Sequence, residues 1–426
     1  MWSTAVLWVR RRSMLLISLL LAVAYREAAA ADLSRGFPFP PDTRPQGCPK
    51  YKQSDFANVS VSIIIPWLGE KWEHMEGTMK ALVHMTPDVL VKEYIWISDG
   101  NDDTRETELK AISDKVVVFG FPQRVGLMVA KTKGVEMATG DVIVFYEAHC
   151  IANKHWLQHI LYRVIQNPKT LAMPYLDMIN ARNWHSYSAM SPGHWRYEWN
   201  FNLIYTNPEG RMGTSAEPHM SPGTSGGIFA INKAWFDKLR LFDPGMREWG
   251  GDHMELTMKV WRCGGNIEMV PCSRVGHLYR DPSQRPYNVE VNTVVHNYKR
   301  LAELWARDHL DYFYKMKPEA KPMKLQGMEL QIQRYEELQQ ELQCKDMQWY
   351  LDNIDVEMKW EMAHICHPFA APNDPIKCEG GQSKLIPGRW TVTKMMPKAE
   401  YVKARQEADE RLKIDQQEWQ KVHSEL

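Results

Sequence analysis

The sequence predicts an α/β protein with a mostly parallel, doubly wound, Rossmann-like sheet flanked by helices, on three observations. From about residue 57 onward, short β-branched apolar runs alternate with stretches of helical periodicity, which is the pattern of a parallel sheet. Acidic residues directly follow two of these runs, and such sheets bind ligands beyond the carboxyl ends of their strands. The chain has 426 residues, 44% of them apolar, which is enough for one large core with appendages.

The elements of this sheet follow one another closely in the first half of the chain. In order, we expect a strand at 59–65, a helix at 70–84, strands at 94–98 and 116–121, a helix at 128–137 and a strand at 142–145. Farther along, Leu256, Val260 and Cys263 fall on one face of a helix that Gly264-Gly265 ends. A further strand is expected at 267–270.

The N-terminus has the three parts of a secretory signal. A basic run, Arg10-Arg11-Arg12, is followed by an apolar run from Met14 to Tyr25 and then by small residues. The apolar run is shorter than the ~20 residues that span a bilayer. A signal peptide within residues 1–31 is therefore favoured, and the upstream apolar residues Val6–Val9 leave a signal-anchor open. Residues 32–56, rich in Pro, Gly and charge, predict a stem or linker.

Charge composition restricts the possible partners. Lys plus Arg equals Asp plus Glu at 52 each, so no overall basic field indicates binding to nucleic acid or to an anionic membrane surface. A membrane contact is expected only through the N-terminal segment. The 17 Trp and 17 Tyr residues suit carbohydrate binding, although most such side chains pack a core.

Two acidic strand ends are candidate binding sites. Asp99 follows the strand at 94–98, where a carboxylate could hold a ribose or base, and an ordinary polar turn is the alternative. Glu147 and His149 follow the strand at 142–145 and lie on the same side of an extended backbone. One carboxylate and one imidazole suit a divalent ion such as manganese, and a surface pair is the alternative.

The segment from Trp249 to Arg280 has the densest polar pattern in the chain. The turn Gly250-Gly251 permits a close approach of backbone to ligand, and Asp252, His253 and Glu255 cluster at the start of the helix that follows. Polar clusters at loop-to-helix junctions are typical of binding and catalytic sites.

The tripeptide Asn58-Val59-Ser60 matches the acceptor pattern for N-glycosylation. Its place at the edge of a predicted strand favours a match to the pattern that carries no glycan. At the other end of the chain, residues 399–426 are charged and favour a helix, for which a solvated surface helix is the prediction and partner binding the alternative.

Several ordered motifs resemble those of the polypeptide N-acetylgalactosaminyltransferases, the Golgi enzymes that start mucin-type O-glycosylation. The resemblance covers residues 55–358. Its motifs are Arg124 with Gly126-Leu127-Met128, Ala148-His149-Cys150 with His155-Trp156-Leu157, Gly226-Gly227-Ile228-Phe229, the segment from Trp249, Asn297–Trp305, and Cys344-Lys345 with Trp349-Tyr350-Leu351.

The resemblance implies a GT-A glycosyltransferase fold over residues 57–358 that uses a UDP-sugar and Mn²⁺. It implies transfer of GalNAc from UDP-GalNAc to Ser or Thr hydroxyls of polypeptides, with retention of anomeric configuration. Glu147, His149 and His277 take the positions of the metal ligands. The other implied site residues are Asp99 and Arg124 at the nucleotide, Gly227, Trp249, Asp252 and His253 near the sugar and diphosphate, and Arg280 and Tyr287 on a closing loop.

The chain departs from the family pattern at three places. Glu147 stands where the pattern has Asp, Asp252-His253 stands for Glu-Asn, and Ile63–Glu70 replaces a Thr-Phe-His-Asn-Glu type run. These departures leave open a transferase with another UDP-sugar or acceptor, and a catalytically silent relative that binds nucleotide or glycopeptide.

By the same resemblance, Cys48 pairs with Cys272 and Cys263 with Cys344. Cys150 is expected as a free buried thiol, which leaves Cys366 and Cys378 as a possible third pair. Residues 359–426 are expected to form a C-terminal extension in place of the family's lectin domain. The implied location is the Golgi lumen as a type II membrane protein, or outside the cell if the signal is cleaved.

Overall fold

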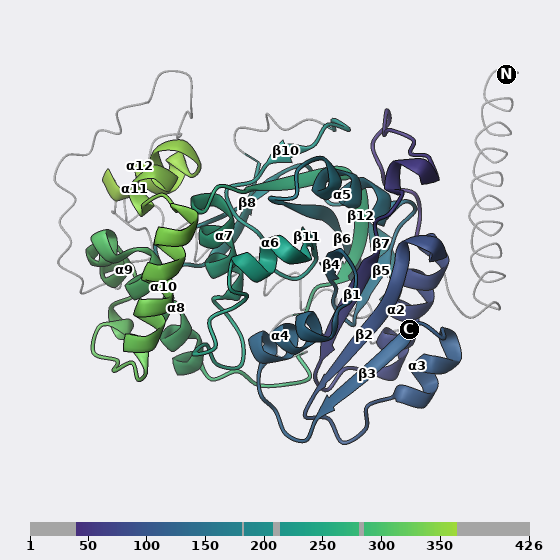
Figure 1. Ribbon diagram of the computed structural model, residues 1–426, viewed down its shortest axis with the longest axis horizontal. Coiled ribbons are helices and arrows are strands. Elements are labelled where there is room, and N and C mark those ends of the chain that lie inside the picture. The colour runs from purple at the N-terminus through teal and green to yellow at the C-terminus, as the bar shows by residue number, and fades with distance from the viewer. Residues whose placement is uncertain (1–39, 181–182, 208–213, 281–284, 364–426) are drawn as a thin grey trace, which may run out of the picture. The chain divides into compact units, whose positions relative to one another are not determined.

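The computed structural model describes residues 40–180, 183–207, 214–280 and 285–363, which are coloured in Figure 1. The chain divides into one unit of residues 1–207 and 212–358 and a second of residues 208–211 and 359–426. Only residues 359–363 of the second unit are described, so the fold given below is that of the first. The predicted signal, most of the C-terminal extension, and Cys366 and Cys378 lie outside the described residues.

Most of the strands belong to one large mixed sheet. The strands are β1 (Val61–Trp67), β2 (Val91–Asp99), β3 (Val116–Phe121), β4 (Val142–Phe145), β5 (Cys150–Ala152), β6 (Thr170–Asn180), β7 (Asn183–Ser188), β8 (His194–Tyr197), β9 (Leu203–Thr206), β10 (His219–Met220), β11 (Phe229–Asn232) and β12 (Asn266–Leu278). The main path of the sheet runs β10-β12-β6-β11-β4-β1-β2-β3, while β8 and β9 form a separate antiparallel pair.

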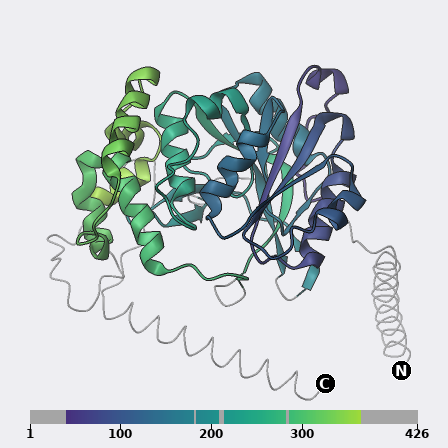
Figure 2. The same cartoon turned by 60° about the horizontal axis from the view of Figure 1, so that its bottom comes forward.

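The helices connect and cover these strands. They are α2 (Trp72–Met85), α3 (Glu106–Ile112), α4 (Leu127–Met137), α5 (Trp156–Gln166), α6 (Lys233–Lys238), α7 (Asp252–Arg262), α8 (Val291–Trp305), α9 (Leu310–Met316), α10 (Met328–Leu342), α11 (Met347–Asn353) and α12 (Val356–Ala363). Figures 1 and 2 both show α8 to α11 gathered at the end of the sheet that is farthest from β3.

The central pairings are parallel, as predicted. β4, β1, β2 and β3 form one parallel block, and β6 and β12 form a parallel pair. β11 runs antiparallel between β4 and β6 and joins the two groups. Because a parallel block directs all its carboxyl ends to one edge, residues that follow β1, β2 and β4 meet there.

Helices bury both faces of the sheet at β1. Ile63 and Ile65 belong to the same buried cluster as Met75 and Met79 of α2 and Leu157 of α5. Successive side chains of a strand point to opposite faces, so Ile64 faces the other side. There a Cβ on Gly134 of α4 would lie 2.2 Å from the Ile64 side chain, so the two backbones pack closely. This two-sided burial explains the apolar run from Ile63 to Trp67 in β1.

The predicted strands at 116–121 and 142–145 coincide with β3 and β4. The strand predicted from Val59 begins instead at Val61, because the Val59 N–H bonds to the Phe56 carbonyl in a turn. The strand predicted at 267–270 extends to Leu278 as β12, since pairing with β6 and β5 continues beyond the apolar run.

Both disulfides implied by the resemblance are confirmed. Cys48 bonds to Cys272 and Cys263 to Cys344, while Cys150 is free and buried. The first bond ties the segment before β1 to β12, and the second ties the end of α7 to the segment after α10. Among the described residues, none of the helices is long and apolar enough to cross a membrane.

Candidate active site

A cavity of about 280 Å³ lies at the carboxyl edge of the parallel block. Trp67 and Asp99 end β1 and β2, Tyr146 follows β4, and all three side chains line the cavity. His277 of β12 and Tyr287 close it from the second half of the chain. The position agrees with the prediction that ligands bind beyond the strand ends.

Glu147, His149 and His277 form the chemical centre of this cavity. One ligand atom from each lies within 4.8 Å of the others, and within the described ranges this is the only such group of three or more acidic, His or Cys residues. The Glu147 Oε2 atom is 2.7 Å from His277 Nε2 and 3.9 Å from His149 Nε2. All three side chains are partly exposed to the cavity.

The pairing of β5 with β12 brings these residues together. Cys150 of β5 is opposite His277 in an antiparallel register, and the Leu278 N–H donates to the His149 carbonyl at 3.3 Å. Glu147 and His149 are thus placed beside a histidine that is more than a hundred residues away in the sequence. The sequence motif alone supplied two of the three groups.

Glu70, directly beyond β1, organises the neighbouring side chains. Its carboxylate lies 3.0 Å from His149 Nδ1 and 2.7 Å from His74 Nδ1, and it accepts hydrogen bonds from Arg280 at 2.6 and 2.7 Å. Burial opposes the charged form of Glu70, but the imidazoles and the guanidinium around it hold its pKa well below the ordinary value. Glu70 therefore remains an anion that orients a histidine and an arginine.

Electrostatics keep the metal-ligating forms of the site populated. Burial alone would raise the pKa of Glu147, but His277 and His149 beside it lower that pKa to about 2. Burial also lowers the pKa of His149 below its usual range, against the opposing effect of Glu70 and Glu147. An ionised carboxylate and a neutral imidazole are the protonation states that bind a metal.

These residues fit a divalent cation of intermediate softness. One carboxylate and two imidazoles suit Mn²⁺, Fe²⁺ or Zn²⁺ more than Ca²⁺, which takes oxygen ligands. The other ring nitrogen of His149 faces Glu70, an arrangement that fixes the orientation of histidine ligands in metal sites. His277 faces Glu147 with its Nε2 atom. The other ring nitrogen, Nδ1, has no hydrogen-bond partner within the described residues.

A turn at Gly226-Gly227 lies directly against Glu147, and Gly227 lines the cavity. A Cβ on Gly227 would lie 2.8 Å from Glu147 Oε1, so only glycine permits this approach. Lys131 of α4 donates to the Gly226 carbonyl at 3.0 Å and to Asp252 Oδ2 at 2.8 Å. Burial opposes ionisation of Asp252, but Lys131 and His253 hold its pKa below the ordinary value.

Asp252 and His253 are therefore placed outside the cavity wall. Both side chains are buried, and of the residues around the Gly226-Gly227 turn it is Lys131 and Gly227 that line the cavity. The His253 ring stacks on Tyr197 with centroids 5.7 Å apart. Asp252 and His253 therefore do not line the cavity themselves. They affect it only through Lys131 and the Gly226-Gly227 turn, which lie between them and the cavity.

The predicted residues Asp99, Arg124 and Trp249 also line the cavity. Asp99 accepts from the Val125 and Gly126 N–H groups at 2.6 and 3.2 Å, so its carboxylate holds the loop that carries Arg124. Arg124 donates to the Asn288 carbonyl at 3.0 Å and lies over the Tyr287 ring. Trp249 lines the cavity with the Arg285 guanidinium 5.2 Å from its ring centroid.

Two further residues belong to this site, although the motifs did not single them out. Glu70 was quoted only as part of a departing segment, yet it follows a buried strand in the same way as Asp99 and Glu147. Lys131 shares a buried helical stripe with Met128 and Val135, and a cation on such a stripe is a signal of a specific partner.

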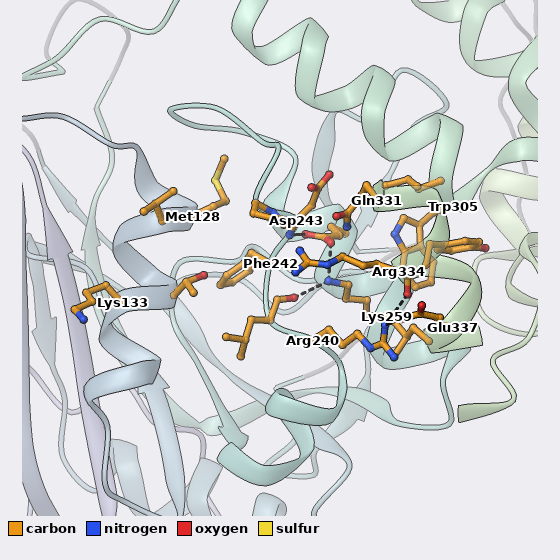
Figure 3. A pocket seen from close by; sticks show the side chains of 18 of the residues that line it. Met128, Lys133, Arg240, Phe242, Asp243, Lys259, Trp305, Gln331, Arg334 and Glu337 are labelled. Atoms are coloured by element: carbon orange, nitrogen blue, oxygen red, sulfur yellow. Dashed lines mark hydrogen bonds and ion pairs between the residues drawn. The ribbon is translucent and has the colours of Figure 1, made fainter. Parts of the chain in front are cut away.

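A larger cavity, of about 660 Å³, lies on the other side of α4 and is shown in Figure 3. Its walls come from α4, the segment 240–244, α7, α8 and α10, and include Met128, Phe242, Lys259, Trp305 and Arg334. Of the residues that the sequence singled out, Glu255 lines it, whereas the predicted metal, nucleotide and sugar residues do not. The predicted metal, nucleotide and sugar residues that line a cavity thus line the smaller one.

Comparison with known proteins identifies the type of fold and its relatives. The family described as Glycosyl transferase family 2 matches residues 62–240, and the N-terminal domain of galactosyltransferase matches residues 214–281. A crystal structure of GalNAc-T7 with UDP, GalNAc and Mn²⁺ aligns with a TM-score of 0.67 at 26% identity, covering 75% of this chain and 61% of that one. The GT-A fold expected from the resemblance is thereby confirmed.

Two curated relatives illustrate the similarity of this chain to known proteins. Human polypeptide N-acetylgalactosaminyltransferase 10 is 32% identical over 324 residues, which are 74% of this chain and 52% of that protein. The inactive polypeptide N-acetylgalactosaminyltransferase-like protein 5 of Macaca fascicularis is 30% identical over 332 residues, 75% of this chain and 72% of that protein. The chain spans about half the length of the first of these relatives.

Proposed function

The chain belongs to the polypeptide N-acetylgalactosaminyltransferase family, and from that premise we propose that it transfers GalNAc from UDP-GalNAc to Ser or Thr hydroxyls of polypeptides with Mn²⁺ as cofactor. One observation carries the proposal: Glu147, His149 and His277 converge at the carboxyl edge of the sheet, inside a cavity. The cavity volume of about 280 Å³ is near the lower limit for small-molecule sites.

Glu147, His149 and His277 would hold the metal, which supplies positive charge against the diphosphate as it leaves. Arg280 adds a cation on the same wall, and Glu70 fixes its orientation through two hydrogen bonds. Preorganised charge of this kind stabilises a developing anion without reorganisation at the moment of reaction. The acceptor hydroxyl attacks from the leaving group's side, so the anomeric configuration is retained.

Donor recognition is divided between two groups of lining residues. We assign Asp99, Arg124 and Tyr287 to the nucleotide, because Asp99 holds the loop of Arg124 and Arg124 lies over the Tyr287 ring. Gly227 and Trp249 are assigned to the sugar and diphosphate, with Lys131, Asp252 and His253 supporting the Gly226-Gly227 turn. Trp67, Tyr146 and Tyr279 also line the cavity, with their polar atoms buried and without partners among the described residues.

A transferase with a different UDP-sugar is the second candidate. The Asp252 carboxylate is bound by Lys131 and His253 and does not line the cavity. A site in which a lysine replaces a carboxylate at the sugar offers a donor of hydrogen bonds where an acceptor is expected. This change alters which sugar hydroxyls are recognised.

A silent relative that binds nucleotide or glycopeptide is the third candidate. The Glu147 carboxylate lies 2.7 Å from His277 Nε2, a direct contact that metal binding must replace by two metal–ligand bonds. The macaque protein named as inactive is similar to this chain at 30% identity. Metal binding and turnover therefore need separate measurements.

The full chain, secreted from a eukaryotic host, is assayed with several UDP-sugars, Mn²⁺ and a Ser/Thr peptide. Transfer from UDP-GalNAc supports the first candidate, transfer from another donor the second, and UDP binding without turnover the third. His149→Ala and Glu147→Ala abolish Mn²⁺-dependent transfer if the site is correct. Glu76→Gln, a change in a partly exposed residue of α2 outside the cavity, serves as the matched control.

The cellular location follows from the sequence of the N-terminus and from the cysteine pairing. Disulfides persist in the secretory pathway, and both bonds of the structure join distant parts of the chain. We place the protein in the Golgi lumen, anchored or secreted according to the fate of its N-terminal segment. The peptide acceptor and the UDP-sugar are its proposed partners.

A further inference from the structure

The turn before β1 contains Asn58-Val59-Ser60, the only Asn-x-Ser/Thr tripeptide with x other than Pro in the sequence. The strand does not include it, because β1 begins at Val61. A 3-10 helix, η1 (Gln53–Phe56), ends just before it, and the Val59 N–H donates to the Phe56 carbonyl at 3.2 Å. Asn58 thus lies in the turn that leads into β1, while Ser60 directly precedes the strand and its carbonyl accepts from the Val142 N–H.

The Asn58 side chain is accessible. Asn58 is exposed and has a φ of 65°, in the left-handed region that asparagine tolerates better than most residues. Its carboxamide has no hydrogen-bond partner in the part of the chain that the structure describes. The nitrogen that would carry a sugar is therefore not committed to the fold.

The surface beside Asn58 leaves room for an attached group. An open hollow of about 730 Å³ is lined by Asn58 together with Val89 and Leu90, and Val89 is 62% exposed. Ser60 lies at its rim, where its hydroxyl donates to Asp141 at 2.8 Å. The first sugars of a glycan would cover exposed Val89 without displacing a buried side chain.

We propose that Asn58 is an N-glycosylation site, modified during entry into the secretory pathway. The Asn58 amide nitrogen bonds to the anomeric carbon of an oligosaccharide, and the bond from that carbon to a polyprenyl diphosphate breaks. The amide loses one proton and the lipid diphosphate leaves as the anion. The reaction precedes folding, when the Ser60 hydroxyl is still free to be recognised. Afterwards the same hydroxyl bonds to Asp141.

The location of Asn58 keeps the glycan away from the cavity. Asn58 precedes β1, while Glu70 and the cavity lie beyond the other end of that strand. A strand advances about 3.3 Å per residue, so the length of β1 separates the two by about 20 Å. Modification at the amino edge of the parallel block is thus compatible with ligand binding at the carboxyl edge.

The test is expression of the full chain, with its own N-terminus, in a eukaryotic secretory host, followed by digestion with peptide-N-glycosidase. The wild-type protein is expected to shift to higher mobility on digestion, with Asn58 converted to Asp in the peptide mass. Asn58→Gln comigrates with the digested protein and does not shift. Ser60→Thr keeps both the acceptor pattern and a hydroxyl for Asp141, and it shifts like the wild type.

Two results would overturn the proposal. One is a wild-type protein whose mobility is unchanged by digestion in both cell lysate and medium. The other is a shift that persists in Asn58→Gln, since no other acceptor tripeptide exists. UDP and Mn²⁺ binding by Asn58→Gln, equal to that of the wild type, tests the separation from the cavity, and a loss of binding in the folded variant contradicts that separation.

Discussion

Glu70 and His149 form the link between the first strand of the sheet and the metal-site residues. The Glu70 carboxylate lies 3.0 Å from His149 Nδ1, which leaves Nε2 of the same ring facing Glu147 at 3.9 Å. A carboxylate behind a ligating histidine fixes the tautomer and orientation of the ring. The orientation of His149 therefore depends on Glu70, which is not one of the three proposed metal ligands.

Glu70→Gln weakens Mn²⁺ binding without unfolding the protein. Loss of such a supporting carboxylate costs about ten- to a hundredfold in metal affinity. Arg280 also loses its ionic partner, so UDP affinity falls in the presence of metal. Titration calorimetry with Mn²⁺ measures the first effect, and Glu76→Gln is the control on α2. Unchanged Mn²⁺ affinity in Glu70→Gln would show that His149 is held by other contacts.

Gly227→Ala disrupts the approach of the turn to Glu147. The added Cβ would lie 2.8 Å from Glu147 Oε1, so the carboxylate or the turn must move. We expect lower affinity for both Mn²⁺ and the UDP-sugar, measured in the same titrations. Gly327→Ala is the control, because nothing lies within 4 Å of its Cβ position and its effect is limited to about 1–2 kcal/mol of backbone strain. Equal ligand affinities in the two variants would contradict the close contact.

Lys131→Met destabilises the fold by leaving a buried carboxylate without its cation. Lys131 and Asp252 are each about 5% exposed or less, and breaking a buried ion pair costs about 3–5 kcal/mol. The pKa of Asp252, now held low by Lys131 and His253, rises in the variant. Denaturant unfolding measures the loss. The double variant with Asp252→Asn recovers part of it, and an additive result would mean that the two side chains do not interact.

His159 makes stability depend on pH. Burial, with the nearby Arg44, lowers the pKa of His159 from 6.5 to about 4. The unfolded chain binds a proton between these values and the folded chain does not, so stability decreases as pH falls from 6.5 toward 4 and levels off below. His159→Phe should have a flatter profile of unfolding free energy against pH, whereas His84→Gln, at an exposed position, should not. A profile unchanged in His159→Phe excludes this group as the source.

Much of the site was predictable because each motif follows a strand. Asp99 comes directly at the end of an apolar run, as do Glu147 and His149, and local periodicity predicts where such runs end. Strand direction in a parallel block then places them at one edge. Both disulfides were implied by the resemblance and are present.

Glu70 and Lys131 were missed for a common reason. Their roles depend on partners far away in the sequence: His149 and Arg280 for Glu70, Asp252 and the Gly226 carbonyl for Lys131. The sequence can mark a charged residue beyond a strand or on a buried helical face, but only the three-dimensional packing determines which charges meet.

The amino-acid sequence by itself determined the alternation of strands and helices, and it predicts the edge at which ligands bind and the residues of the metal site, since these follow from local periodicity and from ordered motifs. Only the tertiary structure decided how the two parallel groups of strands join into one sheet. Antiparallel β11 joins the two parallel groups, and the β5–β12 register sets His277 beside Glu147 and His149. It also decided that Asp252 contacts Lys131 and that Asn58 lies in an open turn. These outcomes depend on contacts between segments distant in the chain, whose free energy no local pattern encodes.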